Sequence, residues 1–302
     1  MIKLGIAPIN WTNDDMPELG GDISFEQCIS EMALAGYKGC EVGTKYPVND
    51  RFLLKEKLNS RGITICNQWF SYEFSTKTFK EVKDNFINQI DFLNFFDAKV
   101  IGGAEVGNSI HGQYNIPLSN RKPGSKENWR KLTEGLNELG KISLNEFGIK
   151  LSYHHHMGTM VETMSEVDRL LNETNDKYVN LNYDCGHFYM AGDSPLIAIQ
   201  KYIVRTSHIH FKDVRELIKE KVFNEKLSFL EGVKLGMFTV PGDGDLDMKP
   251  IAKAVHESNY KGWLVVEAEQ DPAKANPFEY AKIGYNYLKK TLENCKIDLS
   301  IN

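Results

Sequence analysis

Short β-branched segments alternate with stretches of helical apolar spacing along the whole chain. Each segment of strand character is followed by one with the i, i+3, i+4 pattern of an amphipathic helix. Strands that alternate with helices pair in parallel, because parallel neighbours need a crossover connection. The eight predicted strands lie at 3–8, 39–43, 63–69, 99–103, 150–155, 179–184, 206–212 and 262–267.

The clearest amphipathic spacing predicts six helices. The first begins at Phe25 behind Ser24, a residue type that caps helix N-termini. Gly62 and Gly148 each follow a helical stretch and precede an apolar residue, which is typical of a helix that ends at a left-handed glycine before a strand. The predicted helices lie at 25–33, 79–96, 129–147, 161–171, 248–255 and 278–292.

The repeated strand–helix unit decides the predicted fold class. Eight units in 302 residues favour an α/β fold, a closed (β/α)₈ TIM barrel. An open doubly wound sheet is the alternative, but no G-x-G-x-x-G run follows the first strand. No linker divides the chain, so residues 1–302 are predicted to form one domain. Long connections at 105–126 and 214–246 are predicted to be functional loops at the C-terminal face of the barrel.

Composition and charge narrow the function classes. Apolar residues make up 41% and charged residues 25%, as in an ordinary globular protein. A net charge of −5 with scattered Lys and Arg argues against nucleic-acid partners and against an anionic membrane surface. No apolar run reaches the roughly 20 residues of a transmembrane helix, and the N-terminus does not resemble a signal peptide. Five cysteines without a CxxC pair predict a reduced, cytoplasmic protein, for which a homo-oligomer stays open.

Ligand-type side chains gather at the ends of the last four predicted strands. These ends hold six of the eight histidines and several acids. Successive strand residues alternate faces, so residues two apart share one side. The carboxyl ends of neighbouring barrel strands lie at one face, where the inward members can converge. The runs are 153–159 (YHHHMGT), 182–187 (NYDCGH), 207–213 (SHIHFKD) and 265–269 (VVEAE).

A divalent metal ion is the ligand that these residues favour. Asp184, His210 and Glu267, with His154 or His156, form a mixed shell of nitrogen and carboxylate donors that suits Mn²⁺, Co²⁺ or Zn²⁺. No thiolate joins the set, which argues against a structural zinc site. Taken singly, each residue has a simpler interpretation. A lone histidine near a strand end is commonly a hydrogen-bonded structural residue, and the HHH run is compatible with a solvated loop.

Residues after the first three strands are candidates for substrate binding. Asn10 and Trp11 offer an amide and an aromatic face on which a sugar-like ring could stack, and Trp69 offers a second aromatic face. Glu41, predicted to be buried at a strand end, needs a partner or a substrate hydroxyl. Both tryptophans are equally compatible with plain core packing. Cys185 has no recognisable base at a nucleophile's spacing and is interpreted as structural.

The strand-end set resembles that of the xylose-isomerase-like TIM barrels, which typically bind a divalent metal through Glu, Asp, His and Glu after strands five to eight. The last three match Asp184, His210 and Glu267, whereas His154 stands where that superfamily usually has Glu. Within it, the chain is similar nearly end to end to the inosose dehydratase family of bacterial inositol catabolism. The segments that carry this resemblance are 4–15 (LGIAPINWTNDD), 31–37 (EMALAGY), 41–43 (EVG), 153–159 (YHHHMGT), 208–213 (HIHFKD) and 262–272 (GWLVVEAEQDP).

The resemblance implies an enzyme, a hydro-lyase that dehydrates scyllo-inosose (2-keto-myo-inositol) through an enediolate to 3D-trihydroxycyclohexane-1,2-dione. It implies a cyclic polyol ketone as the partner and Mn²⁺ or Co²⁺ as the cofactor, with glutathione also named for the family. His156, or the more distant Glu162, is the alternative fourth ligand. The implied metal ligands are His154, Asp184, His210 and Glu267. The implied proton-transfer and enolate-binding residues are His187, Lys212 and His156, and the implied ring-binding residues are Asn10, Trp11, Glu41 and Trp69.

Three other functions stay open at this point. A metal-dependent inosose or ketose isomerase or epimerase on the same barrel would return the proton instead of losing water. A DNA-repair nuclease would need clustered metals and a basic face, against which the net charge speaks. A non-catalytic polyol-binding module would bind its ligand without turnover.

Overall fold

Eight parallel strands close into a barrel in the computed structural model, which describes residues 1–295. Their order around the barrel is β1-β10-β7-β6-β5-β4-β3-β2, and β2 pairs back onto β1. The predicted TIM barrel is therefore confirmed, while residues 296–302 of the predicted 1–302 domain lie outside the described residues. The barrel strands are β1 (Ile2–Ile6), β2 (Gly39–Val42), β3 (Thr64–Tyr72), β4 (Val100–Glu105), β5 (Lys150–His154), β6 (Val179–Asp184), β7 (Thr206–Phe211) and β10 (Gly262–Val266).

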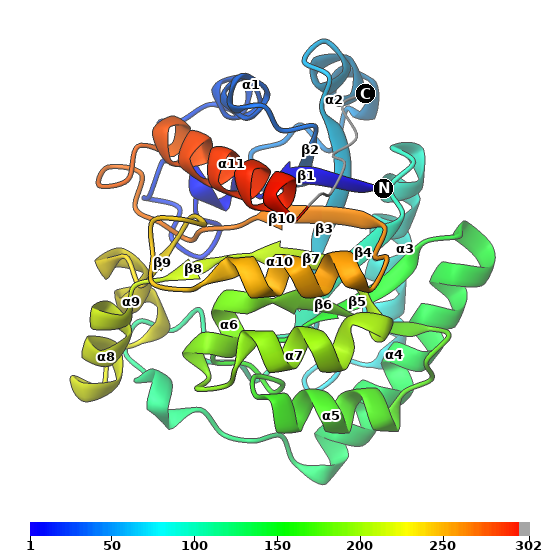
Figure 1. Cartoon of the computed structure of the whole chain (residues 1–302). Helices are drawn as coiled ribbons and strands as arrows, with labels where there is room; N and C mark the ends of the chain where they lie inside the picture. Colours follow the sequence, from blue (N-terminus) through cyan, green and yellow to red (C-terminus); the bar gives the residue numbers. More distant parts are fainter. Residues whose placement is uncertain (296–302) are drawn as a thin grey trace.

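Helices surround this barrel, one after each strand (Figure 1). These outer helices are α1 (Phe25–Ala35), α2 (Arg51–Asn59), α3 (Phe79–Phe95), α4 (Lys126–Phe147), α5 (Met164–Glu173), α7 (Pro195–Tyr202), α10 (Met248–Glu257) and α11 (Pro277–Asn294). The smaller elements are α6 (Cys185–Met190), α8 (Glu216–Asn224), α9 (Phe229–Leu235), the antiparallel pair β8 (Asp213–Val214) and β9 (Phe238–Thr239), and the 3₁₀ turns η1 (Pro8–Asn10), η2 (Leu118–Asn120) and η3 (Ile203–Arg205).

Local sequence signals account for most element boundaries. The Ser24 side chain accepts from the N–H of Gln27, as its predicted capping role requires. Gly148 has φ +66° and ends α4, which confirms the predicted left-handed glycine. The helix predicted from residue 161 begins only at Met164, because Thr163 and Glu166 form a capping box there.

All eight predicted strands are present, and the predicted long connection at 214–246 follows β7, but the elements inside it were not predicted. This segment is not an irregular loop, since it contains α8, α9 and the β8–β9 pair. Its helices have only nine and seven residues, too few for a clear apolar period. The prediction also missed α2, α6 and α7. The predicted long connection at 105–126 is present and is largely irregular, with only the η2 turn between the end of β4 and the start of α4.

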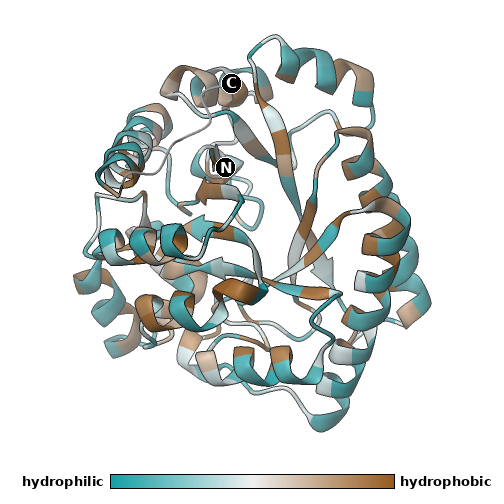
Figure 2. Ribbon diagram, turned by 45° about the vertical axis from the view of Figure 1, so that its right-hand side comes forward, coloured by the Kyte–Doolittle hydropathy of each residue, from teal (hydrophilic) through white to brown (hydrophobic). Residues whose placement is uncertain are grey.

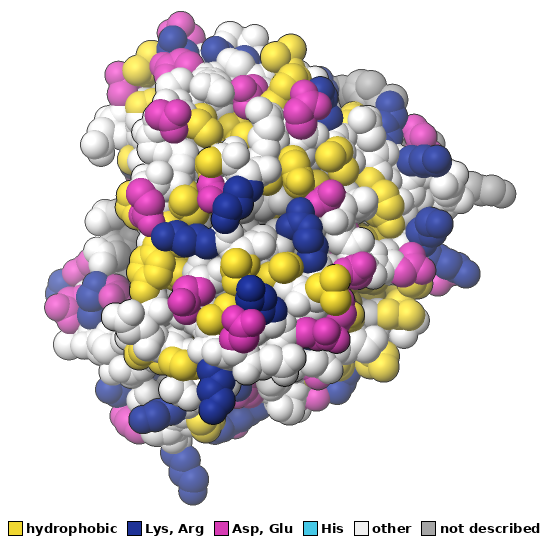
Figure 3. All heavy atoms as spheres, turned by 90° about the vertical axis from the view of Figure 1, so that its left-hand side faces the viewer, with side chains coloured by type: hydrophobic (Ala, Val, Ile, Leu, Met, Phe, Trp, Pro, Cys, Tyr) yellow, Lys and Arg dark blue, Asp and Glu magenta, His cyan; other side chains and the backbone are white. Residues whose placement is uncertain are grey.

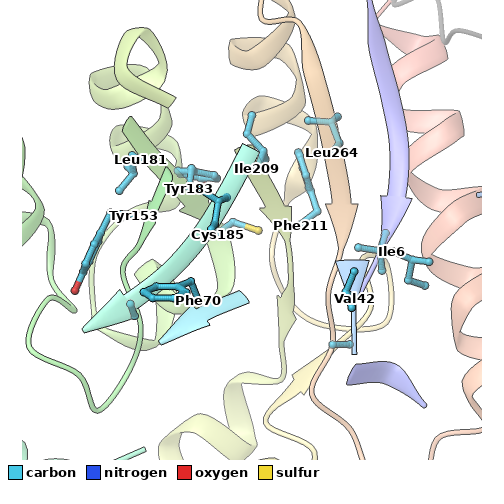
Figure 4. Packing of buried hydrophobic residues seen from close by; sticks show 14 of the residues in the cluster. Ile6, Val42, Phe70, Tyr153, Leu181, Tyr183, Cys185, Ile209, Phe211 and Leu264 are labelled. Atoms are coloured by element: carbon cyan, nitrogen blue, oxygen red, sulfur yellow. The ribbon is translucent and has the colours of Figure 1, made fainter. Parts of the chain in front are cut away.

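Alternate strand residues face two different environments. Tyr183, Ile209 and Leu264 belong to the apolar layer between the strands and the outer helices (Figure 4). The polar residues next to two of them, Asp184 and His210, point into the barrel instead, where they meet one another. Figure 2 shows apolar and polar residues on opposite sides of the outer helices. The apolar layer thus lies outside the barrel, and the interior at the strand ends is left for polar chemistry.

The carboxyl ends of the strands lie at the left of Figure 1, beside α8 and α9. Figure 3 views this face, over which acidic, basic and hydrophobic side chains are interspersed. Within residues 1–295, no helix combines the length and the apolar character needed to cross a bilayer.

Candidate active site

Four side chains from neighbouring strands converge at the carboxyl end of the barrel. His154 ends β5, Asp184 ends β6, His210 lies in β7, and Glu267 follows β10. Nε2 of His154 lies 3.2 Å from Nδ1 of His210 and 3.5 Å from Oδ2 of Asp184. Nδ1 of His210 lies 3.6 Å from the same Asp184 oxygen and 2.9 Å from Oε2 of Glu267. The structure therefore brings the four predicted metal ligands together.

The geometry of this quartet (His154, Asp184, His210 and Glu267) fits a divalent ion. Donors about 2.1 Å from a tetrahedral ion stand roughly 3.4 Å apart, close to the separations found here. Oδ2 of Asp184 is buried and has no hydrogen-bond partner in the described part of the chain. A buried carboxylate oxygen without a hydrogen bond is costly unless a cation meets it, and the Lys212 ammonium stands 3.7 Å away, too far for a hydrogen bond. Two nitrogen and two carboxylate donors suit Mn²⁺, Co²⁺ or Zn²⁺.

Glu41 orients one ligand of the quartet from behind. Its Oε1 lies 3.0 Å from Nε2 of His210, 2.8 Å from Nε2 of His208, and accepts from the side-chain amide of Asn67 at 2.9 Å. Ligating histidines commonly use their second nitrogen in this way, which fixes the ring. Burial acts to raise the pKa of Glu41, but the two histidines outweigh it and hold the pKa well below its usual range.

A buried lysine lies next to the quartet. Nζ of Lys212 lies 2.6 Å from Oε1 of Glu267, 2.9 Å from Oε1 of Glu269 and 2.9 Å from Nε2 of His187. Its stem passes Gly186, where a Cβ would stand 2.7 Å from the lysine Cγ. Burial disfavours the ammonium, yet the facing carboxylates raise the pKa of Lys212 above its ordinary value. Lys212 therefore stays charged between two acids.

The two acids beside Lys212 have different pKa values. Burial acts to raise the pKa of Glu267, but His210 and Lys212 outweigh it and lower the pKa to about 2. Burial prevails at Glu269 and raises its pKa to about 7, although Lys212 opposes the shift. Glu267 is thus ionised at neutral pH and can bind a cation.

A cavity of about 400 Å³ opens above these groups, within the usual size range of small-molecule sites. Its acids and amides alternate with apolar residues, as expected for a polar ring. A larger hollow of about 600 Å³ lies on the outside between residues 74–81 and α4, away from the strand ends. The cavity over the quartet is lined by Ala7, Pro8, Ile9, Asp14, Asp15, Glu41, Val42, Gly43, Thr44, Val48, Gln68, Trp69, Ser71, His111, His156, Glu267 and Glu269.

The predicted proton-transfer residues meet around Glu269. His156 lines the cavity, and its Nε2 lies 3.9 Å from Oε1 of Glu269. Nε2 of His187 lies at the same distance from that oxygen. His187 and Lys212 are fully buried behind the cavity wall. His156 therefore belongs to this second cluster, while His154 belongs to the quartet.

Trp69 and Glu41 line the cavity as the ring-binding prediction requires, but Asn10 and Trp11 do not. Trp11 is 0% exposed and donates its indole N–H to Glu31 of α1 at 2.6 Å. Oδ1 of Asn10 accepts from the N–H of Ala268 at 3.1 Å. The structure therefore places both residues in the packed interior, outside the lining of the cavity, and their contact with a ring stays a prediction.

Three further interpretations can be compared with the structure. The HHH run is not a solvated loop, because His155 is buried and stacks on Phe188 with ring centroids 3.6 Å apart. Glu162 is not near the quartet, since it accepts from the N–H of Gly158 and pairs with Arg121. Sγ of Cys185 is buried against the carbonyl of Lys212, and burial raises its pKa, as expected for a structural thiol.

The sequence prediction assigned no role to four ionisable residues that line the cavity, Asp14, Asp15, His111 and Glu269. Glu269 stands two residues after Glu267, so the strand period could have found it. His111 is a histidine inside the 105–126 connection, which had been predicted to be functional. Asp15 carries no such signal, because loop residues follow no period.

Comparisons with known proteins agree with this geometry. A family model described as a xylose isomerase-like TIM barrel matches residues 17–291. An inosose dehydratase of Geobacillus thermodenitrificans is 53% identical over 291 residues, covering 96% of this chain and 97% of that protein. An inosose dehydratase of Glaesserella parasuis is 52% identical over 292 residues with the same coverage. A solved structure of the IolI protein with a zinc atom has a TM-score of 0.68 at 17% identity and covers 97% of each chain, a likeness that shows the fold alone.

Proposed function

Because this chain belongs to the xylose isomerase-like TIM barrel family and, within it, to the inosose dehydratases, we propose that it dehydrates scyllo-inosose through an enediolate to a trihydroxycyclohexane-1,2-dione. The chain is an enzyme of the hydro-lyase class. The observation that carries this function is a sequence identity of about 50% to inosose dehydratases over nearly the full length of the chain. It favours dehydration over the isomerase or epimerase alternative.

The quartet is the proposed metal site. His154, Asp184, His210 and Glu267 would hold Mn²⁺ or Co²⁺, in keeping with their mixed nitrogen and oxygen donors and their short separations. When bound, the ion would polarise the ketone and stabilise the charge that develops when the neighbouring carbon loses its proton, by several kcal/mol. Glu41 holds the His210 ring in the orientation that this site needs.

His156 is the residue placed to take the proton. Its Nδ1 lies 2.8 Å from the carbonyl oxygen of Met157, which can only accept, so Nδ1 carries the ring proton. Nε2 therefore keeps its lone pair at the cavity wall, ready to act as a general base. After it takes the proton, the nearby carboxylate of Glu269 stabilises the imidazolium.

The leaving hydroxyl departs from the next ring carbon. The proton on His156 can pass to this hydroxyl, so that the hydrogen taken from carbon and the departing OH together form the water. The remaining enol becomes the second carbonyl, and no oxidant or reductant is needed. Lys212 and His187 act as positioning residues, because they lie behind the cavity wall and hold Glu269 in place.

Trp69 and Glu41 are the proposed contacts of the ring. Trp69 is 37% exposed and lines the cavity, with its ring centroid 5.5 Å from that of His154. An exposed aromatic face above a polar floor suits the C–H face of a cyclohexane ring. Glu41 can meet a ring hydroxyl where it borders the cavity.

We further propose a cytoplasmic location, supported by the five cysteines, all of which are unpaired thiols. Glutathione has only the family resemblance in its favour, and no residue is assigned to it.

A direct test uses the purified chain loaded with Mn²⁺ or Co²⁺ and incubated with scyllo-inosose in D₂O. We expect metal-dependent formation of an ultraviolet-absorbing dicarbonyl and one deuteron on the new CH₂ carbon. Metal-stripped protein is the control. Exchange at carbon or an isomeric ketone without water loss would overturn the proposal in favour of the isomerase. Binding without either change would indicate a polyol-binding module.

A further inference from the structure

Two side chains from different loops face one another at the cavity. Asp15 lies in the connection after β1, and His111 lies in the connection after β4. Both line the cavity, and Oδ2 of Asp15 stands 3.9 Å from Nε2 of His111. The His111 ring is 15% exposed and the Asp15 side chain 38%. This separation is too long for a direct hydrogen bond.

The hydrogen bonds of His111 determine which of its ring nitrogens carries the proton. Nδ1 of His111 lies 2.8 Å from Oγ of Ser109. That hydroxyl has a single proton, which it donates to the carbonyl of Val106 at 2.9 Å. Oγ must therefore accept from Nδ1, so Nδ1 carries the ring proton and Nε2 keeps a lone pair. Burial lowers the pKa of His111, which keeps the ring neutral.

Two acceptors thus face each other with no proton between them. A carboxylate oxygen only accepts, and so does the unprotonated nitrogen of a neutral imidazole. Such a pair calls for a ligand that brings two donors. A vicinal diol does so, since each hydroxyl donates one proton. An anionic group such as a phosphate would meet Asp15 and be repelled.

The backbone holds both side chains in position before any ligand arrives. The N–H of Asp15 donates to Oδ1 of Asn13 at 2.9 Å, which fixes the first loop in a tight turn. The N–H of Ile110, next to His111, donates to the carbonyl of Gly158 at 2.9 Å. Gly158 has φ +77°, and a Cβ there would stand 3.0 Å from the backbone nitrogen of His111. The pair therefore needs little reorganisation on binding.

The two loops are also joined to each other. The hydroxyl of Tyr114 donates to Oε1 of Glu18 at 2.8 Å, which links the loop of His111 to the loop of Asp15. Nζ of Lys234 in α9 donates to the same oxygen at 3.0 Å. The distance between Asp15 and His111 is thus a property of three connected segments.

We propose that Asp15 and His111 bind two adjacent hydroxyls of the substrate on the ring edge remote from the ketone, and so select neutral, unphosphorylated cyclic polyols. This inference rests on the proposed function. The quartet would bind the reacting edge of the ring at the ends of β5, β6, β7 and β10, whereas Asp15 and His111 lie in the connections after β1 and β4.

The test compares the KM values of variants at each residue with substrate analogues that lack the hydroxyl which that residue would bind. Asp15→Ala and His111→Phe are compared with the wild-type chain on scyllo-inosose and on analogues that each lack one hydroxyl remote from the ketone. With scyllo-inosose, each variant should raise KM roughly 10- to 100-fold with kcat nearly unchanged, as expected for the loss of one hydrogen bond to the substrate. With the analogue that lacks the hydroxyl bound by the replaced residue, the KM of the variant should exceed that of the wild type by less than about threefold. Asp22→Ala, an exposed change in the same loop, is the matched control.

Calorimetry of scyllo-inosose binding gives a second readout that needs no turnover. If each variant raised KM equally with every analogue, or left KM unchanged with scyllo-inosose, the inference would be overturned and the proposed function would still stand. Pair-dependent binding by a wild-type chain that releases no water would overturn the proposed function and support the inference. A wild-type chain that neither binds nor dehydrates scyllo-inosose would overturn both.

Discussion

Nε2 of His154 lies 3.2 Å from Nδ1 of His210, inside a barrel where neither ring reaches solvent. Two ring nitrogens at that distance either share one proton or direct two lone pairs at the same point. Oδ2 of Asp184, which has no hydrogen-bond partner among the described residues, lies 3.5 and 3.6 Å from these two nitrogens and 3.7 Å from the Lys212 ammonium. A cation among the three would satisfy all of them at once.

Asp184→Asn should remove metal binding and turnover while leaving the fold in place. The change is isosteric and keeps an acceptor for the N–H of His187, which the Asp184 side chain caps, but it removes the negative charge at the quartet. We expect bound metal and kcat to fall at least about 100-fold, with the circular dichroism spectrum unchanged. Asp91→Asn on the surface of α3 is the control. Full metal content in the Asp184 variant would refute the assignment of this ligand.

Glu41→Gln should weaken the metal site without removing a ligand. The carboxylate orients His210 and His208, and loss of such an outer partner typically costs 10- to 100-fold in metal affinity. Glu105→Gln is a matched control, since Glu105 is also a buried acid at a strand end but accepts from Ser75 and the N–H of Phe74 instead. Titration with Co²⁺, followed by its visible absorption, measures the affinity. Equal affinities in the two variants would argue against the positioning role.

The sequence was sufficient for the barrel and for Asp184, His210 and Glu267 of the quartet because these depend on periodicity, but His154 and His156 share one face, so periodicity left both open. The alternation of strand residues places His154 and His210 inside the barrel, while apolar neighbours in the same strands, such as Ile209, face the helices. The sequence could not place Trp11, because an aromatic residue after a strand is compatible with either the cavity or the core. It could not pair Asp15 with His111 either, since loop conformations brought them together. Periodicity predicts the sites on strands, and tertiary packing decides the rest.

Lys212→Met should destabilise the chain far more than removal of a surface ion pair. The ammonium is buried between Glu267 and Glu269, and its loss leaves Glu269 without this ion pair and Glu267 with His210 alone; breaking a buried ion pair typically costs 3–5 kcal/mol. The exposed pair of Lys201 and Asp168 makes a control, for which Lys201→Met should cost less than about 1 kcal/mol. Urea unfolding of metal-free protein gives both values. Similar losses in the two variants would contradict the structural account of Lys212.

We expect Trp69 to contribute to substrate binding and Trp11 to contribute to the stability of the fold. Trp69→Ala should raise KM about tenfold, since about 50 Å² of apolar contact is worth roughly 1.3 kcal/mol. Trp11→Phe should leave KM unchanged and lower the free energy of unfolding by about 1–2 kcal/mol, because the hydrogen bond to Glu31 is lost. Steady-state kinetics with scyllo-inosose and urea unfolding provide the two readouts. A higher KM in the Trp11 variant alone would reverse these roles.

Glu162→Gln should change how the stability of the chain depends on pH. Burial raises the pKa of Glu162 from its ordinary 4.5 to about 7, although Arg121 opposes the shift from 3.1 Å. The folded chain therefore holds this proton more tightly than the unfolded chain. Its stabilising contribution is complete below about pH 4.5 and is lost as the pH rises through about 7. The shift corresponds to about 3 kcal/mol, so the advantage of the variant over the wild type should grow by up to that amount between pH 5 and pH 8. Urea unfolding at several pH values measures it, with the exposed Glu134→Gln as the control. Parallel stability curves for the wild type and the Glu162 variant would show that the buried carboxyl titrates normally.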